Sequence, residues 1–245
     1  MATYVMSDIH GDYERYRKML QLIRFKDTDT LYILGDIIDR GSNGIKILQD
    51  MMMRPNVYPI LGNHEYMASL CMEWLLQEVT EDSIKGIEPE LMQGLTEWMN
   101  VGGSVTIKEF HALTLEERED IIDYLSEFSL FEEVKAGGRD YILVHAGLEN
   151  FRPERHLEDY DLSEFIFHKA NWTKVYFPDK YLVTGHVPTH VAYAQERGLL
   201  SSEVPKEERK HTIFIRNNNI FIDCGCMYGG QLGCLCLDTM EEFYV

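Results

Sequence analysis

The sequence predicts a layered α/β fold, a central sandwich of two β-sheets flanked by helices, with a helical insertion. Three observations predict it: short apolar runs alternate with helix-like segments at the start of the chain, a mostly helical stretch follows, and the later strand-like runs largely succeed one another. Alternation of strands with helices is typical of a parallel sheet, whereas strands that follow one another without helices favour an antiparallel sheet. We expect one domain over residues 1–245, because no linker divides the chain.

The first sheet is predicted from three apolar runs at residues 4–7, 31–34 and 57–61. Each run has the length of a buried strand and is followed by a loop, and helix-like segments occupy residues 12–24 and 43–53. In open sheets of this kind, ligands bind outside the carboxyl ends of the strands. Polar clusters stand at those ends here, so we expect the functional site there.

Residues 67–130 are predicted to form a mostly helical insertion that belongs to the same domain. Within it, Thr114 and Glu117 have the spacing of a capping box ahead of an apolar helical stripe. The acidic run at residues 202–210 is predicted to be a solvated loop. A second, largely antiparallel sheet is expected from the later strand-like runs, at residues 141–144, 181–184, 212–215, 220–222 and 232–237.

The composition limits the classes of function. The chain is 45% hydrophobic, enough for a substantial core, and its 41 acidic residues against 23 basic ones give a net charge of −18. A nonspecific binder of nucleic acid or of an anionic membrane would carry the opposite charge. The first residues offer neither a signal peptide nor a transmembrane helix, so a cytoplasmic location is expected. Five cysteines agree with a reducing compartment.

Four groups of polar residues follow strand-like runs directly and carry nitrogen and oxygen ligands for a metal ion. They are Asp8-x-His10, Gly35-Asp36-x-x-Asp39-Arg40-Gly41, Gly62-Asn63-His64-Glu65, and the strand-end histidines His145 and His186. Taken singly, each is weak evidence, because a Gly-Asp pair is usually a turn and a lone strand-end histidine is usually a core residue. Their joint occurrence favours a metal site, and the absence of thiolates suits manganese, iron or zinc.

These motifs resemble those of the phosphoprotein phosphatase branch of the calcineurin-like metallophosphoesterases, which includes bacterial and phage-type Ser/Thr protein phosphatases. The resemblance covers nearly the whole chain and extends to a closing segment at residues 222–230. It implies the calcineurin-like metallophosphoesterase fold. Arg40 and Glu65 stand at positions specific to this branch, which contains Ser/Thr protein phosphatases and symmetrical diadenosine tetraphosphate hydrolases.

The resemblance also implies two divalent metal ions, with manganese expected first and iron or zinc as alternatives. One ion would be held by Asp8, His10 and Asp36. Asp36 would bridge to the second ion, whose other ligands would be Asn63, His145 and His186. A hydroxide between the ions would then attack phosphorus directly, because coordination lowers the pKa of water from about 16 toward roughly 7.

By the same resemblance, His64 protonates the leaving group and Asp39 orients the ring of His64. A general acid of this kind raises the rate of the reaction on the order of 100- to 10,000-fold. Arg40 and Asn63 would contact the substrate phosphate, and a surface ion pair is the alternative for Arg40. Many bacterial members carry a second phosphate-binding arginine where this chain has Lys174. Lysine keeps the charge but loses the planar fork, so Lys174 is either a phosphate ligand or a solvated lysine.

The expected function is hydrolysis of phosphoserine and phosphothreonine monoesters in proteins, with a phosphorylated protein or a small phosphoester as partner and neither nucleic acid nor a membrane. Symmetrical hydrolysis of diadenosine tetraphosphate is the alternative, because both activities use the same core and would differ around residues 67–130. A catalytically silent binding module is the second alternative, although no expected ligand is missing. The sequence does not define an oligomeric state.

Two pairs of cysteines near the end of the chain offer four thiolates, the number a structural zinc site needs. They are Cys224 with Cys226 and Cys234 with Cys236. A gap of one residue within a strand places both side chains on one face, so we interpret them as buried small hydrophobic residues. The remaining histidines have no motif partner and receive no site role: His111, His156, His168, His190 and His211.

Overall fold

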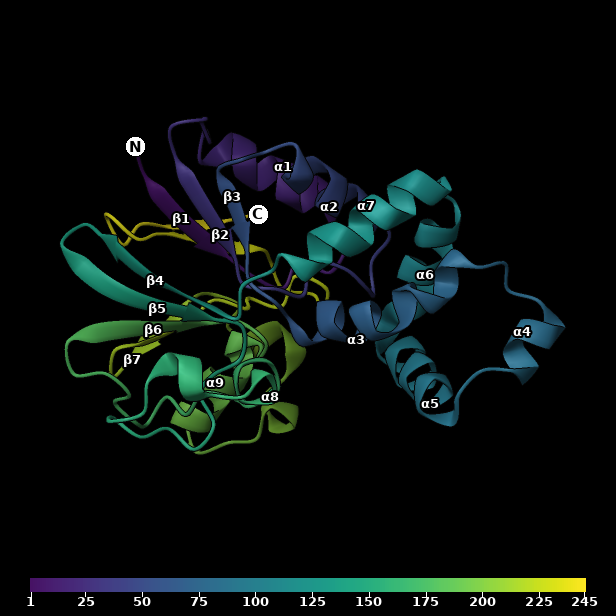
Figure 1. Cartoon of the computed structure of the whole chain (residues 1–245). Coiled ribbons are helices and arrows are strands. Elements are labelled where there is room, and N and C mark those ends of the chain that lie inside the picture. Colours follow the sequence, from purple (N-terminus) through teal and green to yellow (C-terminus); the bar gives the residue numbers. More distant parts are fainter.

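The computed structural model describes residues 1–245 and contains two five-stranded β-sheets with helices around them (Figure 1). The strand order is β10-β9-β1-β2-β3 in the first sheet and β4-β5-β6-β8-β7 in the second. Side chains from both sheets form one buried core, in which Val5 and Leu34 of the first sheet meet Leu143 and Val183 of the second. The predicted sandwich flanked by helices is therefore confirmed.

The first sheet has a parallel centre made of the three predicted strands. These are β1 (Thr3–Met6), β2 (Thr30–Ile33) and β3 (Val57–Pro59), which lie parallel to one another. The apolar run at residues 232–237 was expected in the second sheet, but its strand β9 (Gly233–Cys236) joins the first sheet antiparallel to β1. Strand β10 (Glu242–Tyr244) then pairs with β9 at the edge. A closing hairpin on β1 thus completes this sheet.

The second sheet is mixed, and the expectation of a largely antiparallel sheet is wrong. Its strands are β4 (Phe131–Ala136), β5 (Arg139–Val144), β6 (Lys180–Thr184), β7 (Phe214–Arg216) and β8 (Asn219–Phe221). The pairs β4–β5 and β7–β8 are antiparallel, whereas β5–β6 and β6–β8 are parallel. Parallel neighbours need long crossovers, and these contain the short helices α8 (Leu162–Ile166) and α9 (Thr189–Glu196).

Helices cover the outer face of the first sheet and lead into the insertion (Figure 1). Helices α1 (Tyr13–Leu22) and α2 (Gly44–Met52) follow β1 and β2, and α3 (Asn63–Met72) follows β3. The apolar faces of these helices and the outer side chains of the sheet form the largest buried core, which includes Met6, Tyr16 and Leu48. The alternation seen in the sequence is therefore a true strand–helix repeat.

The predicted insertion is helical, as expected. After α3 come η1 (Trp74–Leu76), α4 (Glu81–Lys85), α5 (Pro89–Trp98), the π-turn η2 (Met99–Gly103), α6 (Ser104–His111) and α7 (Leu115–Ser126). Thr114 caps α7 in the predicted capping box with Glu117. Helix α4 stands away from the body of the molecule, whereas α5 and α6 return to it (Figure 1). No helix of the structure combines the length and apolarity needed to span a bilayer.

The cysteines are buried and unpaired, and they divide between two cores. Cys226, Cys234 and Cys236 face the core beneath the helices, whereas Cys224 lies in the core between the sheets. Burial raises the pKa of the Cys226 thiol to about 11. A thiol of this kind behaves as a small hydrophobic group. The segment at residues 202–210 is mostly exposed and contains two short 3-10 turns, η4 (Ser201–Glu203) and η5 (Lys206–Glu208).

Candidate metal centre

The predicted ligands gather where the carboxyl ends of strands from both sheets meet. Asp8 and His10 follow β1 and Asp36 follows β2, while His145 and His186 come just after β5 and β6. The backbone N–H of His186 donates to Oδ2 of Asp8 at 2.9 Å, which joins the two sheets at this point. The backbone N–H of Gly185 donates in turn to the carbonyl of His145 at 2.8 Å. The fold thus brings together side chains that are up to 178 residues apart.

Six residues of these loops hold a left-handed backbone conformation. They have φ angles between 47° and 70°, and they are Asp8, His10, Asp36, Asp39, Arg40 and His186. Residues with a side chain avoid this conformation at a cost of roughly 1–2 kcal/mol each. Strain of this kind persists where a site requires it. The sharp turns direct the polar side chains toward one centre instead of along the strands.

Asp36 lies at the middle of the cluster, and two histidines point toward it. His10 Nε2 is 3.6 Å from Asp36 Oδ2, and His145 Nε2 is 3.4 Å from Asp36 Oδ1. The other ring nitrogens are bound to backbone carbonyls: His145 Nδ1 lies 2.6 Å from Leu34 O and His10 Nδ1 lies 3.0 Å from Ile38 O. Such a bond fixes the proton on Nδ1, so each Nε2 lone pair faces a carboxylate.

Asn63 begins α3 and adds a third kind of donor beside the histidines. Asn63 Oδ1 is 3.0 Å from His145 Nε2 and 2.9 Å from His186 Nδ1, and these two nitrogens are 3.2 Å apart. Burial, followed by the nearby His145, lowers the pKa of His186 to about 4. Two imidazole nitrogens and an amide oxygen therefore converge on one point, an arrangement that a metal ion stabilises.

The donor atoms form two groups that share Asp36. His10, Asp36 and His64 make one group and Asp36, His145 and His186 the other, with the donor atoms of each within 4.8 Å of one another. Asp8 lies outside both groups, and its oxygens accept hydrogen bonds from Ser7 Oγ and from the His186 N–H. Asp36 therefore has the position expected of a bridging ligand, while Asp8 stays a predicted ligand.

Five buried carboxyl groups lie at or around this centre: Asp8, Asp36, Asp39, Glu65 and Asp223, each at most 3% exposed. Burial, followed by repulsion from Asp223 and Asp36, raises the pKa of Asp8 well above its ordinary value. Burial also raises the pKa of both Glu65 and Asp223 to about 7. So many buried carboxylates need compensating positive charge, which divalent cations supply. The donor set and its charge thus fit a dinuclear metal centre.

His64 and Asp39 form a buried pair beside the donor groups. His64 Nδ1 lies 2.6 Å from Asp39 Oδ2, and the two side chains are 1% and 0% exposed. Burial lowers the pKa of His64, but Asp36 and the hydrogen bond to Asp39 outweigh it and raise this pKa above its ordinary value. The raised pKa favours the protonated ring, and Asp39 fixes its orientation.

Arg40 directs its guanidinium group into the same space. Its Nη2 is 3.0 Å from His64 Nε2, and its Nη1 contacts His10 Nε2. The guanidinium carbon also lies 5.0 Å from the centre of the Tyr228 ring, a cation–π contact from the loop after β8. Arg40 is therefore not the surface ion pair considered as its alternative, and its position suits a phosphate ligand.

Glu65 has a structural task that the sequence did not reveal. Its Oε2 accepts a hydrogen bond from the backbone N–H of Asp36 at 2.8 Å, and its Oε1 accepts from those of Ile37 and Ile38 at 2.7 and 3.1 Å. The side chain is fully buried. Glu65 therefore holds the loop that carries Asp36, and only the branch-specific position of this glutamate signalled its importance.

The structure does not bring Lys174 into the cluster. Its side chain is exposed and makes no hydrogen bond or ion pair, while its carbonyl accepts from Asn219 at 2.7 Å. Lys169, five residues earlier, is instead one of the charges that lower the pKa of His186. Lys169 is exposed, and sequence reasoning missed it because no motif marks it. A phosphate-binding role of Lys174 stays a prediction, and Lys169 is a second candidate.

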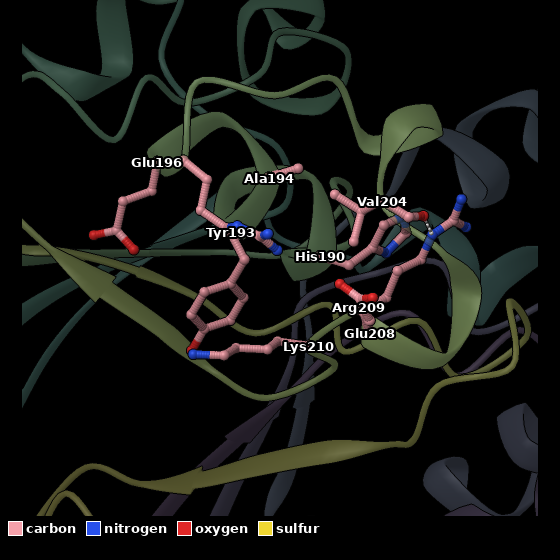
Figure 2. Close-up of a pocket in the computed structure, with 9 residues that line it drawn as sticks. His190, Tyr193, Ala194, Glu196, Val204, Glu208, Arg209 and Lys210 are labelled. Carbon is pink, nitrogen blue, oxygen red and sulfur yellow. Dashed lines mark hydrogen bonds between the residues drawn. The ribbon is translucent and has the colours of Figure 1, made fainter.

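Of the histidines without motif partners, two lie side by side away from the donor groups. The rings of His190 and His211 are 5.1 Å apart between centres, and the Nδ1 atoms of both are buried without a hydrogen-bond partner. His190 lines a small pocket of about 90 Å³ between α9 and residues 204–210, with Tyr193, Arg209 and Lys210 (Figure 2). Neither histidine belongs to a group of three metal-binding side chains.

The sandwich with two groups of metal donors at its strand ends defines a metal-dependent phosphoesterase. The family model of the calcineurin-like phosphoesterases matches residues 1–201. The chain belongs to this family. The resemblance seen in the sequence is thereby confirmed at the level of the family.

Curated proteins and solved structures show further likeness. The chain is 25% identical to the symmetrical bis(5'-nucleosyl)-tetraphosphatase of Nitrosospira multiformis over a segment that covers 60% of this chain and only 44% of that protein. It is 23% identical to the same enzyme of Coxiella burnetii, over 99% of this chain and 91% of that one. The chain therefore spans less than half of the first relative and nearly all of the second.

Two solved phosphatases share the fold. A cold-active protein tyrosine phosphatase superposes with a TM-score of 0.56 at 14% identity, covering 99% of this chain and 78% of that one. A protein serine/threonine phosphatase from Saccharomyces cerevisiae superposes with a TM-score of 0.55 at 12% identity, covering 98% and 73%. At these identities the likeness concerns the fold alone.

Proposed function

We propose that this protein hydrolyses dinucleoside tetraphosphates symmetrically, releasing two nucleoside diphosphates. The observation that carries the proposal is the likeness to the Coxiella burnetii tetraphosphatase over 99% of this chain. Hydrolysis of a phosphoric ester or anhydride follows from the family and from the donor groups around Asp36. The proposal replaces the protein-phosphatase activity expected first, which becomes the second candidate.

The side chains present have a task at each stage of this reaction. Bound divalent ions would supply an activated water molecule and charge for the phosphate oxygens. The planar fork of Arg40 suits two oxygens of one phosphate, and Asn63 is the other phosphate contact that the resemblance implies. The water oxygen bonds to phosphorus, the bond from phosphorus to the bridging oxygen breaks, and His64 gives its Nε2 proton to that oxygen. Asp39 keeps the ring of His64 aimed during the transfer.

The net charge of −18 is compatible with a small polyphosphate. Surface charges are screened beyond about 10 Å, whereas the charge of metal ions and of Arg40 acts at contact distance. A long polyanion such as duplex DNA would meet the acidic surface along its whole length, but four linked phosphates reach little beyond the site. This favours a compact phosphate carrier.

A second candidate is the hydrolysis of phosphoserine and phosphothreonine monoesters in proteins. The buried His64–Asp39 pair favours it, with 2.6 Å between Nδ1 and Oδ2. The leaving group from a phosphoserine is an alkoxide, which is far more basic than a nucleoside diphosphate and depends more strongly on a proton donor. The two candidates therefore make opposite predictions about the substrate.

The experiment that separates them offers both substrates to the same protein. The full chain, loaded with manganese, iron or zinc in turn, is incubated with diadenosine tetraphosphate and with a phosphoserine peptide. Chromatography follows ADP, ATP and AMP, and a colorimetric assay follows phosphate. Asp36→Asn, which loses the shared donor, serves as the control for contaminating phosphatases.

We expect ADP as the product of the dinucleotide and little phosphate from the peptide. Release of ATP with AMP would contradict symmetrical cleavage. Phosphate from the peptide without cleavage of the dinucleotide would favour the second candidate instead. No turnover of either substrate with any metal would return the silent binding module to consideration.

A further inference from the structure

The helical insertion reaches back to the proton donor through the carboxylate of Asp39. Asp39 is fully buried, and three side chains donate hydrogen bonds to it. His64 Nδ1 and Trp98 Nε1 share Oδ2, at 2.6 and 2.8 Å, while Thr106 Oγ1 donates to Oδ1 at 2.6 Å. Two of the three donors therefore come from the insertion, 59 and 67 residues after Asp39.

Thr106 holds both the side chain and the backbone of Asp39. Its hydroxyl donates to Oδ1 and also accepts the backbone N–H of Asp39 at 3.1 Å. With Trp98 on the other oxygen, rotation of the carboxylate would break at least one bond to a buried partner. Trp98 and Thr106 are 0% and 1% exposed, so solvent cannot reach them to replace the lost hydrogen bond.

Two glycines allow the insertion to come this close. Gly102 has φ 118°, and its carbonyl accepts the backbone N–H of Arg40 at 3.1 Å. A Cβ on Gly102 would lie 2.8 Å from Arg40 Cγ, and one on Gly103 would lie 2.5 Å from the indole of Trp98. The π-turn between α5 and α6 thus packs directly on Arg40, and the end of α5 places Trp98 against Asp39.

We propose that Trp98 and Thr106 are positioning residues, which lock the carboxylate of Asp39 and thereby aim His64 at the leaving group. The inference rests on the proposed function, because it takes His64 as the proton donor. It goes beyond that function by making the insertion part of the catalytic apparatus. A tryptophan that only filled the core would not need its N–H, and this difference can be tested.

The test compares substrates that need a proton donor to different degrees. Phenyl phosphate has a basic leaving group, whereas p-nitrophenyl phosphate leaves readily without a proton. Trp98→Phe keeps an aromatic ring but removes the N–H, and Thr106→Val keeps the shape but removes the hydroxyl. Thr106→Ser restores the hydroxyl and should restore activity. Trp74→Phe is the matched control, because Trp74 lies in the same insertion and its indole N–H has no bond to the site.

We expect kcat for phenyl phosphate to fall roughly 10- to 100-fold in Trp98→Phe and in Thr106→Val. The value for p-nitrophenyl phosphate should fall much less, and Trp74→Phe should behave as the wild type. In an Asp39→Asn background, the loss caused by Trp98→Phe should disappear. Equal losses with both substrates, in folded variants, would show a merely structural role and overturn the inference.

A second readout does not depend on turnover. The chain has three tryptophans, so its proton NMR spectrum contains three indole N–H signals, and Trp98→Phe identifies one of them. In the full chain, both metal-free and loaded with diamagnetic zinc, Asp39→Asn should shift that signal upfield. An unchanged signal would overturn the inference even if activity falls. If the wild type releases no ADP from diadenosine tetraphosphate, the proposed function itself fails, an outcome distinct from equal losses in the variants.

Discussion

Glu65→Gln tests how strongly a buried carboxylate holds the loop of Asp36. The glutamate accepts three backbone hydrogen bonds at 2.7 to 3.1 Å inside a fully buried site. Glutamine has one acceptor oxygen, so it can serve Ile37 and Ile38 but turns its NH2 group toward the N–H of Asp36. A lost bond to a charged acceptor contributes about 1.5–3 kcal/mol, and a buried donor without a partner costs about 1–3 kcal/mol. Because burial of the charge offsets part of this, we expect a net loss of about 2–3 kcal/mol.

The loss should be visible by calorimetry of the metal-free protein at pH 8, where Glu65 is ionised. For a chain of this size, the expected decrease in Tm is roughly 4 to 12 °C. Manganese affinity should also fall by about 10- to 100-fold, because the loop positions a shared ligand. Glu78→Gln makes the same chemical change on an exposed side chain and should shift Tm by less than about 2 °C. An equal Tm for the Glu65 variant and the wild type would refute the account of the loop.

Three further predictions concern the same centre. His64→Asn should lower turnover of phenyl phosphate by at least about 100-fold while metal content, measured by mass spectrometry, stays unchanged; loss of metal would show that His64 is a ligand instead. Burial, followed by repulsion from Asp36, raises the pKa of Asp223 to about 7, so its contribution to metal-free stability is complete below pH 3.8 and is lost as the pH rises to 7. The increase in Tm on adding manganese should therefore grow from pH 5 to pH 7.5, and a constant increase would count against this origin. Lys169→Ala should raise the KM for diadenosine tetraphosphate about fivefold and more than Lys174→Ala does, since the charge of Lys169 acts on His186; the reverse order would assign the phosphate contact to Lys174.

Local patterns predicted most of the fold. The parallel strands β1 to β3 and the capped helix α7 follow from periodicity and from end signals that depend on neighbouring residues only. The partner of a strand depends on the whole chain, which is why residues 232–237 were placed in the wrong sheet. Strand β4 was missed because its side chains alternate little and only Ala136 is buried.

The sequence predicts the site residues that belong to a motif and can themselves bind a metal ion. It does not predict the residues that only hold those site residues in place. His10, Asp36, Asn63, His145 and His186 converge as the motifs indicated. Glu65 and Trp98 support the site through hydrogen bonds to residues distant in sequence, and no spacing rule reveals such contacts. The carboxylate of Asp8 illustrates the opposite limit, because a motif predicts a ligand but not the hydrogen bonds that compete for its oxygens.

The left-handed residues of the site have a consequence for variation of this protein. Six positions combine an unfavourable backbone with a functional side chain, so glycine at any of them would relieve strain of about 1 kcal/mol while removing a ligand, the orienting carboxylate or the phosphate clamp. Random selection for heat resistance alone should therefore collect glycine or asparagine at positions such as Asp8, where burial also disfavours the charge, and lose activity as it does so. Stabilisation that preserves activity has to come from elsewhere in the chain, because here resistance to heat and turnover are in direct opposition.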